Sequence, residues 1–153
     1  MPITRGYMLD QKTVFVAPKD IQRKWYLIDA KDKILGRVAT EVSKLLRGKH
    51  KVEFSPHQEL GDYVIIINAE KVSLSGNKTM QKTYHRHSGF PGSLKSETFL
   101  ELNNRKPGYV LKLAIKRMLP KNKLGAKLMN NVKIYAGETE HPHSAQKPEI
   151  YTL

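Results

Sequence analysis

The chain has 153 residues, 39% of them apolar, and a formal net charge of +13 at pH 7. This length favours a single domain with its own hydrophobic core over two full domains. The absence of cysteine excludes disulfide scaffolds, thiolate zinc sites and cysteine nucleophiles. The longest strongly apolar run, residues 63–67, is too short to cross a bilayer, and the first 24 residues lack the apolar stretch of a secretory signal. We therefore expect a cytoplasmic protein with no membrane partner.

Hydrophobic patterning predicts a strand, a helix and a second strand in the first half of the chain. Residues 1–24 mix Pro, Gly, Lys and Asp without periodicity and are predicted to form an extended N-terminal arm. Residues 25–28 form an apolar run typical of a strand. Residues 35–46 carry apolar side chains at helical spacing, and Gly48 follows as a residue that ends helices. Residues 63–68 contain three consecutive isoleucines, as expected for a strand covered on both faces.

The second half predicts shorter elements around one clear helix. Residues 72–74 indicate a brief strand and residues 81–87 an extended segment, whereas two glycines and a proline exclude regular structure at 88–93. A helix is predicted between Pro107, which suits its first turn, and Pro120, which stops it.

Residues 132–135 predict a last strand, and the chain from residue 141 is predicted to be a surface tail. Strands alternating with helices predict an α/β layer structure with a small, largely parallel sheet flanked by helices. We expect one domain over residues 25–153, preceded by the arm at 1–24.

Positive charge is concentrated in two segments. Residues 77–95 contain four Lys or Arg and no acid, and residues 105–127 contain eight and no acid. These twelve charges leave only +1 for the rest of a chain whose total is +13. A surface of like charges lowers stability unless a polyanion neutralises it, and nucleic-acid phosphate is such a polyanion. The alternative is a solvated surface, but such surfaces usually mix both signs.

Eight blocks of the sequence form a recognisable set: Trp25–Ala30, Leu35–Arg37, Arg47–Lys51, Gly61-Asp62, Asn68–Val72, Tyr84–Gly89, Met118–Lys121 and His141–Gln146. In these blocks and in their order, the chain resembles the bacterial-type L-thirteen family of large-subunit ribosomal proteins from about residue 25 to residue 148. The resemblance implies a compact three-layer α/β domain that binds large-subunit ribosomal RNA of the 23S type. It also implies a role in early subunit assembly and in translation, beside neighbouring ribosomal proteins and without a cofactor or small-molecule substrate.

Three positions depart from the family pattern. Ser93 and Arg117 each stand where the family usually has a glycine, and Ala126 stands where it usually has an arginine. The charge gained at 117 offsets the charge lost at 126. The expectation of RNA binding is therefore unchanged.

The residue types themselves indicate how RNA would be bound. Lys and Arg neutralise phosphates, while planar side chains stack on unpaired bases at about 1–3 kcal/mol per base. Glycines such as Gly89 let the backbone approach the sugar-phosphate chain. The predicted RNA-binding residues are Arg37, Lys49, Lys51, Lys78, Lys82, Tyr84, His85, Arg86, His87, Ser88, Gly89, Lys95, Lys116, Arg117, Lys121, Lys123, Lys127, His141 and His143.

Simpler explanations exist for parts of this set. For residues 49 and 51, favourable interaction of a cation with the end of the first helix explains the charge nearly as well. A mobile basic loop is the alternative for residues 77–95, and a solvated turn is the alternative for the lysines at 121–127.

No enzymatic motif is complete. Gly48-Lys49 lacks the glycine and the Ser/Thr of a phosphate-binding loop, and no dinucleotide fingerprint follows a predicted strand. The histidine pairs within 85–87 and 141–143 could ligate a metal, but no acid or cysteine lies nearby to complete a site. Asp29 and Asp62 suit turn and capping roles. We therefore predict a non-catalytic protein without a metal or cofactor, and the alternatives are a nucleotide- or RNA-processing enzyme and a non-specific DNA-compacting protein.

Overall fold

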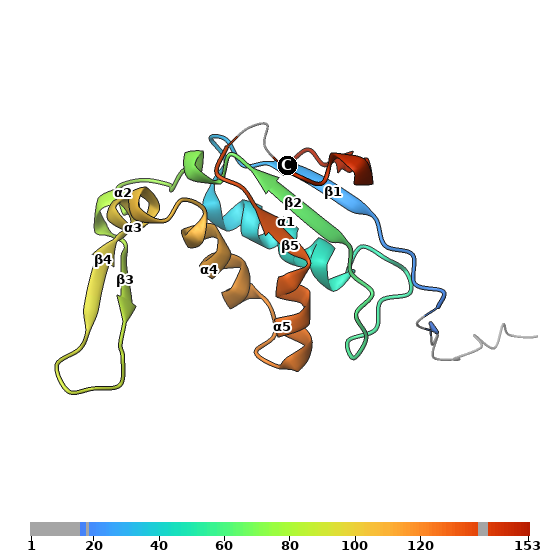
Figure 1. The fold of residues 1–153 in the computed structure, drawn as a ribbon, viewed down its shortest axis with the longest axis horizontal. Coiled ribbons are helices and arrows are strands. Elements are labelled where there is room, and N and C mark those ends of the chain that lie inside the picture. The colour runs from blue at the N-terminus through green and yellow to red at the C-terminus, as the bar shows by residue number, and fades with distance from the viewer. Residues whose placement is uncertain (1–15, 18, 138–140) are drawn as a thin grey trace, which may run out of the picture.

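The computed structural model describes residues 16–17, 19–137 and 141–153, and a four-stranded sheet is its central feature (Figure 1). The strand order is β5-β2-β1-β6 and every pairing in this sheet is parallel. The predicted α/β class with a largely parallel sheet is therefore confirmed. The strands are β1 (Trp25–Asp29), β2 (Tyr63–Ile67), β5 (Val132–Ile134) and β6 (Glu149–Ile150).

One face of the sheet packs on the longer helices, which form a single hydrophobic cluster with it. Successive side chains of a strand point to opposite faces, so Ile28, Val64 and Ile66 share this face. All three are fully buried in the cluster, and each such side chain contributes roughly 1.5–3 kcal/mol by leaving water. The helices that complete the cluster are α1 (Leu35–Arg47), α4 (Tyr109–Met118) and α5 (Lys123–Asn130).

The opposite face of the sheet carries a stack of rings in place of a long helix. Trp25 stacks on Tyr63 with ring centroids 4.4 Å apart, and His143 stacks on Trp25 at 5.3 Å. His143 is followed by a short 3-10 helix, Ser144–Gln146. This segment makes a thin third layer and then supplies β6, which the sequence did not predict within the C-terminal tail.

The predicted N-terminal arm falls in part outside the described residues, which omit 1–15 and 18. Val16 is buried, and Gln58 Nε2 donates a hydrogen bond of 3.0 Å to its carbonyl oxygen. The Arg23 guanidinium lies 5.7 Å from the centre of the Tyr63 ring. The described part of the arm is therefore attached beside the start of β2.

An antiparallel hairpin projects from the domain, away from the sheet (Figure 1). Its strands are β3 (Thr83–Arg86) and β4 (Lys95–Thr98), preceded by α2 (Lys78–Gln81) and followed by α3 (Phe99–Arg105). The backbone N–H of Thr98 donates to Glu101 and that of Glu101 donates back to Thr98, so α3 begins with a capping box.

Three predicted elements differ in extent from those in the structure. Residues 72–74 are not a strand, because Ser73 makes only an isolated bridge to Ile34. The extended segment predicted at 81–87 shortens to β3, since α2 includes Gln81. The helix predicted from Pro107 begins at Tyr109, because Gly108 takes a left-handed φ of 76° and is the N-cap.

A buried carboxylate joins the starts of β1 and β2 to the chain that follows α1. Asp62 has no exposed surface, and its Oδ1 accepts hydrogen bonds from the Lys24 N–H at 2.9 Å and from Lys51 Nζ at 2.6 Å. His50 Nε2 lies 2.8 Å from the other carboxylate oxygen. Lys51 also donates to two backbone carbonyls, those of residues 22 and 60, so its ammonium group has three protein acceptors.

The residue before Asp62 must be a glycine. A Cβ at Gly61 would lie 1.6 Å from the carbonyl oxygen of Leu46, which is backbone and cannot move aside. The Asp62 N–H donates to the Leu45 carbonyl oxygen at 3.2 Å, one residue earlier in α1. This close approach brings the carboxylate within reach of Lys51.

We predict that Lys51→Met destabilises the protein by about 3–5 kcal/mol, because the buried Asp62 carboxylate loses a neutralising cation. Lys49→Met removes the same charge from an exposed position and is expected to change the free energy of unfolding by less than about 0.5 kcal/mol. Urea unfolding monitored by circular dichroism measures both. Equal losses in the two variants would contradict an internal role for Lys51.

Candidate nucleic-acid interface

The hairpin exposes most of the predicted site residues of the first basic segment. His85, Arg86 and Lys95 are exposed on its strands, and the connecting loop exposes every residue from 87 to 92. The side chain of Phe90 is 74% exposed at the tip of this loop. Cations and planar rings are therefore presented together on the element that extends farthest from the sheet (Figure 1).

Hydrogen bonds within the loop hold its shape. Ser88 Oγ donates to Ser93 Oγ at 2.8 Å, and Ser93 Oγ donates to the Phe90 carbonyl oxygen at 2.7 Å. The Gly89 N–H donates to His87 Nδ1 at 2.9 Å, with Gly89 at a positive φ of 99°. The loop is therefore preorganised by its own side chains, and Ser93 is the residue that closes it.

The two basic segments meet in a hollow of about 320 Å³ beside Tyr84. Lys78 and Lys82 line it from the first segment and Arg117 lines it from α4. None of the described residues that line it is an acid. The start of α1, which has no acidic residue in its first turn, also lines this hollow and adds the partial positive charge of a helix N-terminus.

Tyr84 is the ring around which these cations gather. Lys82 Nζ lies 5.5 Å from the ring centre. Burial raises the pKa of the Tyr84 phenol above its ordinary value, and the charge of Arg117 opposes part of that shift. The hydroxyl group is therefore protonated at neutral pH and available as a hydrogen-bond donor.

A smaller hollow of about 130 Å³ lies between the hairpin and the α3–α4 region. Arg86, Lys95 and Arg117 line it, and Glu97 is the one acid among the described lining residues. Glu97 is paired with Arg105, so its charge is neutralised within the protein. Sequence reasoning did not single out Arg105 as a site residue, although the density of cations in residues 105–127 was the available signal.

The remaining predicted cations lie at other places on the surface. Arg37 is exposed on α1 and lines a separate hollow with Tyr151, and Lys49 is exposed just after α1. The predicted lysines of α4, α5 and the turn between them are exposed and do not line the two hollows beside Tyr84; they are Lys116, Lys121, Lys123 and Lys127.

Two predicted site histidines are engaged inside the protein or half-buried. His143 stacks on Trp25, and its Nε2 lies 2.9 Å from the Tyr135 hydroxyl. His141 is half-buried, and its Nδ1 is a buried atom without a hydrogen-bond partner. Lys51, which binds Asp62, and His143 are therefore held by contacts within the protein that the sequence pattern did not predict.

Metal sites and membrane-spanning helices are two further features to consider in the described part of the chain. Within it, no group of three or more His, Cys, Asp or Glu side chains is placed to hold a metal ion. No helix there is both long enough and apolar enough to span a membrane.

The fold and the interface together define a class of protein. It is an α/β domain on a parallel sheet, and its basic hairpin and cation-lined hollows suit a polyanionic partner. The family model described as Ribosomal protein L13 matches residues 23–142. The chain is 52% identical over 142 residues to large ribosomal subunit protein uL13 of Tolumonas auensis, covering 93% of this chain and 99% of that protein. It is 54% identical over 139 residues to the protein of the same name from Natranaerobius thermophilus, covering 90% and 96% respectively.

The protein of that name from Thermotoga petrophila is 51% identical over 147 residues, which cover 96% of this chain and 98% of that protein. The chain therefore belongs to the ribosomal protein L13 family, and the resemblance found in the sequence is confirmed. This is a family of structural ribosomal proteins and not of enzymes, which confirms the non-catalytic interpretation.

We predict that Ser93→Gly loosens the hairpin loop while leaving the domain intact. The Ser88 N–H loses its acceptor, Ser93 Oγ at 3.4 Å, and Ser88 Oγ loses the same partner. Hydrogen exchange at the Ser88 amide should become about tenfold faster, the equivalent of one net hydrogen bond. The Tyr84 amide within β3 serves as the internal control and should keep its exchange rate. Unchanged exchange at Ser88 would show that Ser93 does not hold the loop.

Proposed function

We propose that this chain is a structural constituent of the large ribosomal subunit that binds 23S-type ribosomal RNA through its hairpin and the hollows beside it. In this role the protein supports early assembly of the subunit, and through it translation. The partners are the RNA and neighbouring large-subunit proteins, and the place of action is the cytoplasmic ribosome. No small-molecule substrate, cofactor or metal is part of this function.

One observation carries the proposal: cations from two distant parts of the sequence line one hollow. Lys78 begins α2 and Lys82 directly precedes β3, whereas Arg117 comes from α4, yet all three line the hollow beside Tyr84. Bringing like charges together costs free energy unless a polyanion neutralises them. Phosphate groups repay that cost, because binding them releases the counterions condensed on the nucleic acid.

The exposed rings favour folded RNA with unpaired bases over duplex DNA. His87 and Phe90 are exposed at the loop tip, where a planar side chain can stack on a base that is not paired. In a DNA duplex the bases are paired and stacked on one another, so a ring can stack there only where the duplex is first kinked and unstacked. The loop also keeps its shape through internal hydrogen bonds, so little conformational entropy is lost when RNA binds.

The mechanism follows from a rigid core that holds these surfaces in fixed relative positions. The hairpin and α4 present cations from different directions, so one protein molecule can contact RNA segments that are remote in the RNA sequence. Neutralising phosphates where such segments approach reduces their repulsion. The protein would thereby stabilise the folded arrangement of the RNA while the subunit assembles.

We predict that combining Lys78→Gln, Lys82→Gln and Arg86→Gln weakens binding to a 23S-type RNA transcript and reduces its salt dependence. Each phosphate contact contributes about 0.7–0.9 to the slope of log K against log salt concentration. Loss of three contacts should therefore flatten the slope by about two units. Filter binding over a series of KCl concentrations measures the slope.

The matched control combines Lys31→Gln, Lys33→Gln and Lys147→Gln, three exposed lysines away from the hairpin. This variant removes the same net charge and should keep a slope close to that of the unmodified protein. Identical slopes for the hairpin variant and the unmodified protein would refute the proposed phosphate contacts.

A further inference from the structure

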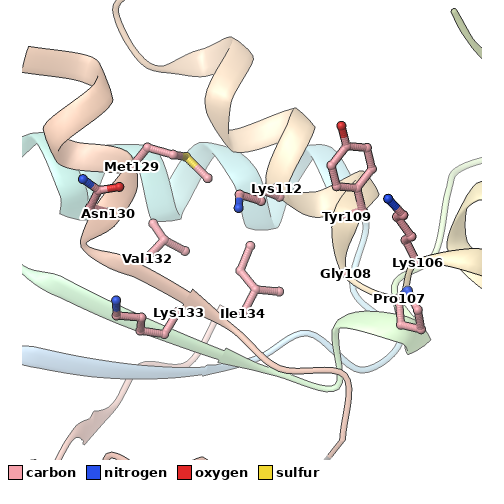
Figure 2. A pocket seen from close by; sticks show the side chains of 10 residues that line it. All are labelled: Lys106, Pro107, Gly108, Tyr109, Lys112, Met129, Asn130, Val132, Lys133 and Ile134. Atoms are coloured by element: carbon pink, nitrogen blue, oxygen red, sulfur yellow. The ribbon is translucent and has the colours of Figure 1, made fainter. Parts of the chain in front are cut away.

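A third hollow, of about 500 Å³, lies between α4 and the edge strand β5 (Figure 2). Two lysines line it from the side of α4, because Lys106 precedes the helix and Lys112 is on it. Lys133 of β5 lies at the edge of the hollow, on the opposite face of the strand from Val132 and Ile134. In Figure 2, Val132 and Ile134 point from β5 toward α4, whereas the Lys133 side chain extends away from Lys112. Among the described residues lining this hollow there is no Asp or Glu.

The start of α4 forms one end of this hollow and brings a ring to it. Lys106 Nζ lies 5.9 Å from the centre of the Tyr109 ring, and Tyr109 is 39% exposed. Gly108 allows α4 to begin this close to β5, because a Cβ there would lie 2.9 Å from Ile134 Cγ2. The first turn of α4 has no acidic residue, so its N-terminal partial charge is not neutralised locally.

The three hollows are neighbours around α4. The hollow beside β5 and the one at the hairpin share the lining residues Lys106 and Tyr109. The hairpin hollow in turn shares Tyr84 and Arg117 with the hollow at the start of α1. Each of the two tyrosines has a lysine over its ring. Cations and two tyrosine rings therefore line a series of adjacent hollows from α1 to the edge of the sheet.

We propose that a single-stranded stretch of RNA follows these hollows as one track, and that Lys106, Tyr109, Lys112 and Lys133 form its far end. Cations and aromatic rings side by side suit the phosphates and bases of a strand whose bases are unpaired. Lys133 is informative because it lies outside both basic segments and is flanked by the apolar Val132 and Ile134. The proposal rests on the proposed RNA-binding function and extends it to a surface that the charge pattern alone did not indicate.

The first test combines Lys106→Gln, Lys112→Gln and Lys133→Gln in the full chain. With a 23S-type transcript as the probe, the slope of log K against log salt concentration should flatten by about two units. The Lys31, Lys33 and Lys147 variant described above controls for net charge, and circular dichroism verifies that each variant is folded. The slope could stay unchanged in this variant and yet flatten in the variant of Lys78, Lys82 and Arg86. That result would overturn the track and leave the proposed function standing. No change in either variant would overturn both.

The second test uses the absence of cysteine from the sequence. Lys133→Cys and Arg86→Cys each create the single thiol of the chain, to which an iron chelate that generates hydroxyl radicals is attached. In the complex with the transcript, cleavage from the two positions should fall on neighbouring nucleotides of one RNA strand. Cleavage from position 86 alone, or in RNA segments that are not neighbours, would overturn the track. If the β5 side instead serves an acidic protein partner, the RNA would not lie near position 133. Cleavage would then come from position 86 alone, which is the result that contradicts the track.

Discussion

The position of the whole interface depends on one buried carboxylate. A charge without exposed surface is stable only where cations and N–H groups surround it. Asp62 is surrounded in this way by Lys24, His50 and Lys51, and its own N–H is bonded to the last turns of α1. These contacts fix where β2 starts relative to β1 and to α1. The helix α4 packs on α1 within the same hydrophobic cluster. The position of the α4 cations therefore depends on where this junction holds α1.

The charges of this chain divide into those used by the fold and those left for a partner. Lys51 is enclosed by protein acceptors, and Arg105 neutralises Glu97, the acid nearest the hairpin cations. The pairing leaves a surface of one sign, because it removes a negative charge that would repel phosphate. Repulsion among the remaining cations is the stability cost that a bound polyanion offsets. This charge distribution is the one expected of a chain that acts in a complex with a polyanion, as proposed above.

The sequence predicted the elements whose hydrophobic pattern is long and regular, and it missed those that depend on a few side chains. The first strand, α1, the second strand and α4 carry continuous apolar runs or helical spacing. The capping box of Thr98 and Glu101 is visible in the sequence and marks the start of a helix, but α3 was not among the predicted elements. The helix α5 is only eight residues long and contains Gly125, where a Cβ would lie 1.8 Å from the Pro120 carbonyl oxygen. Here a close local approach of the chain requires a glycine in spite of its low helix propensity, and sequence patterning alone does not reveal that approach.

The same distinction applies to the interface. Residue type and charge density predicted the site residues that the hairpin carries, because its cations and rings are neighbours in sequence, but β4 and the hairpin itself were not predicted. The approach of Arg117 to Tyr84 joins positions 33 residues apart and required the packing of α4 on the domain. Charge alone also could not separate Lys49, which is exposed, from Lys51, which lies over a buried acid. A cation in a sequence is therefore a candidate for RNA until the fold shows whether a protein acceptor already holds it, and in this chain the hollows around α4 are lined mainly by cations without such an acceptor.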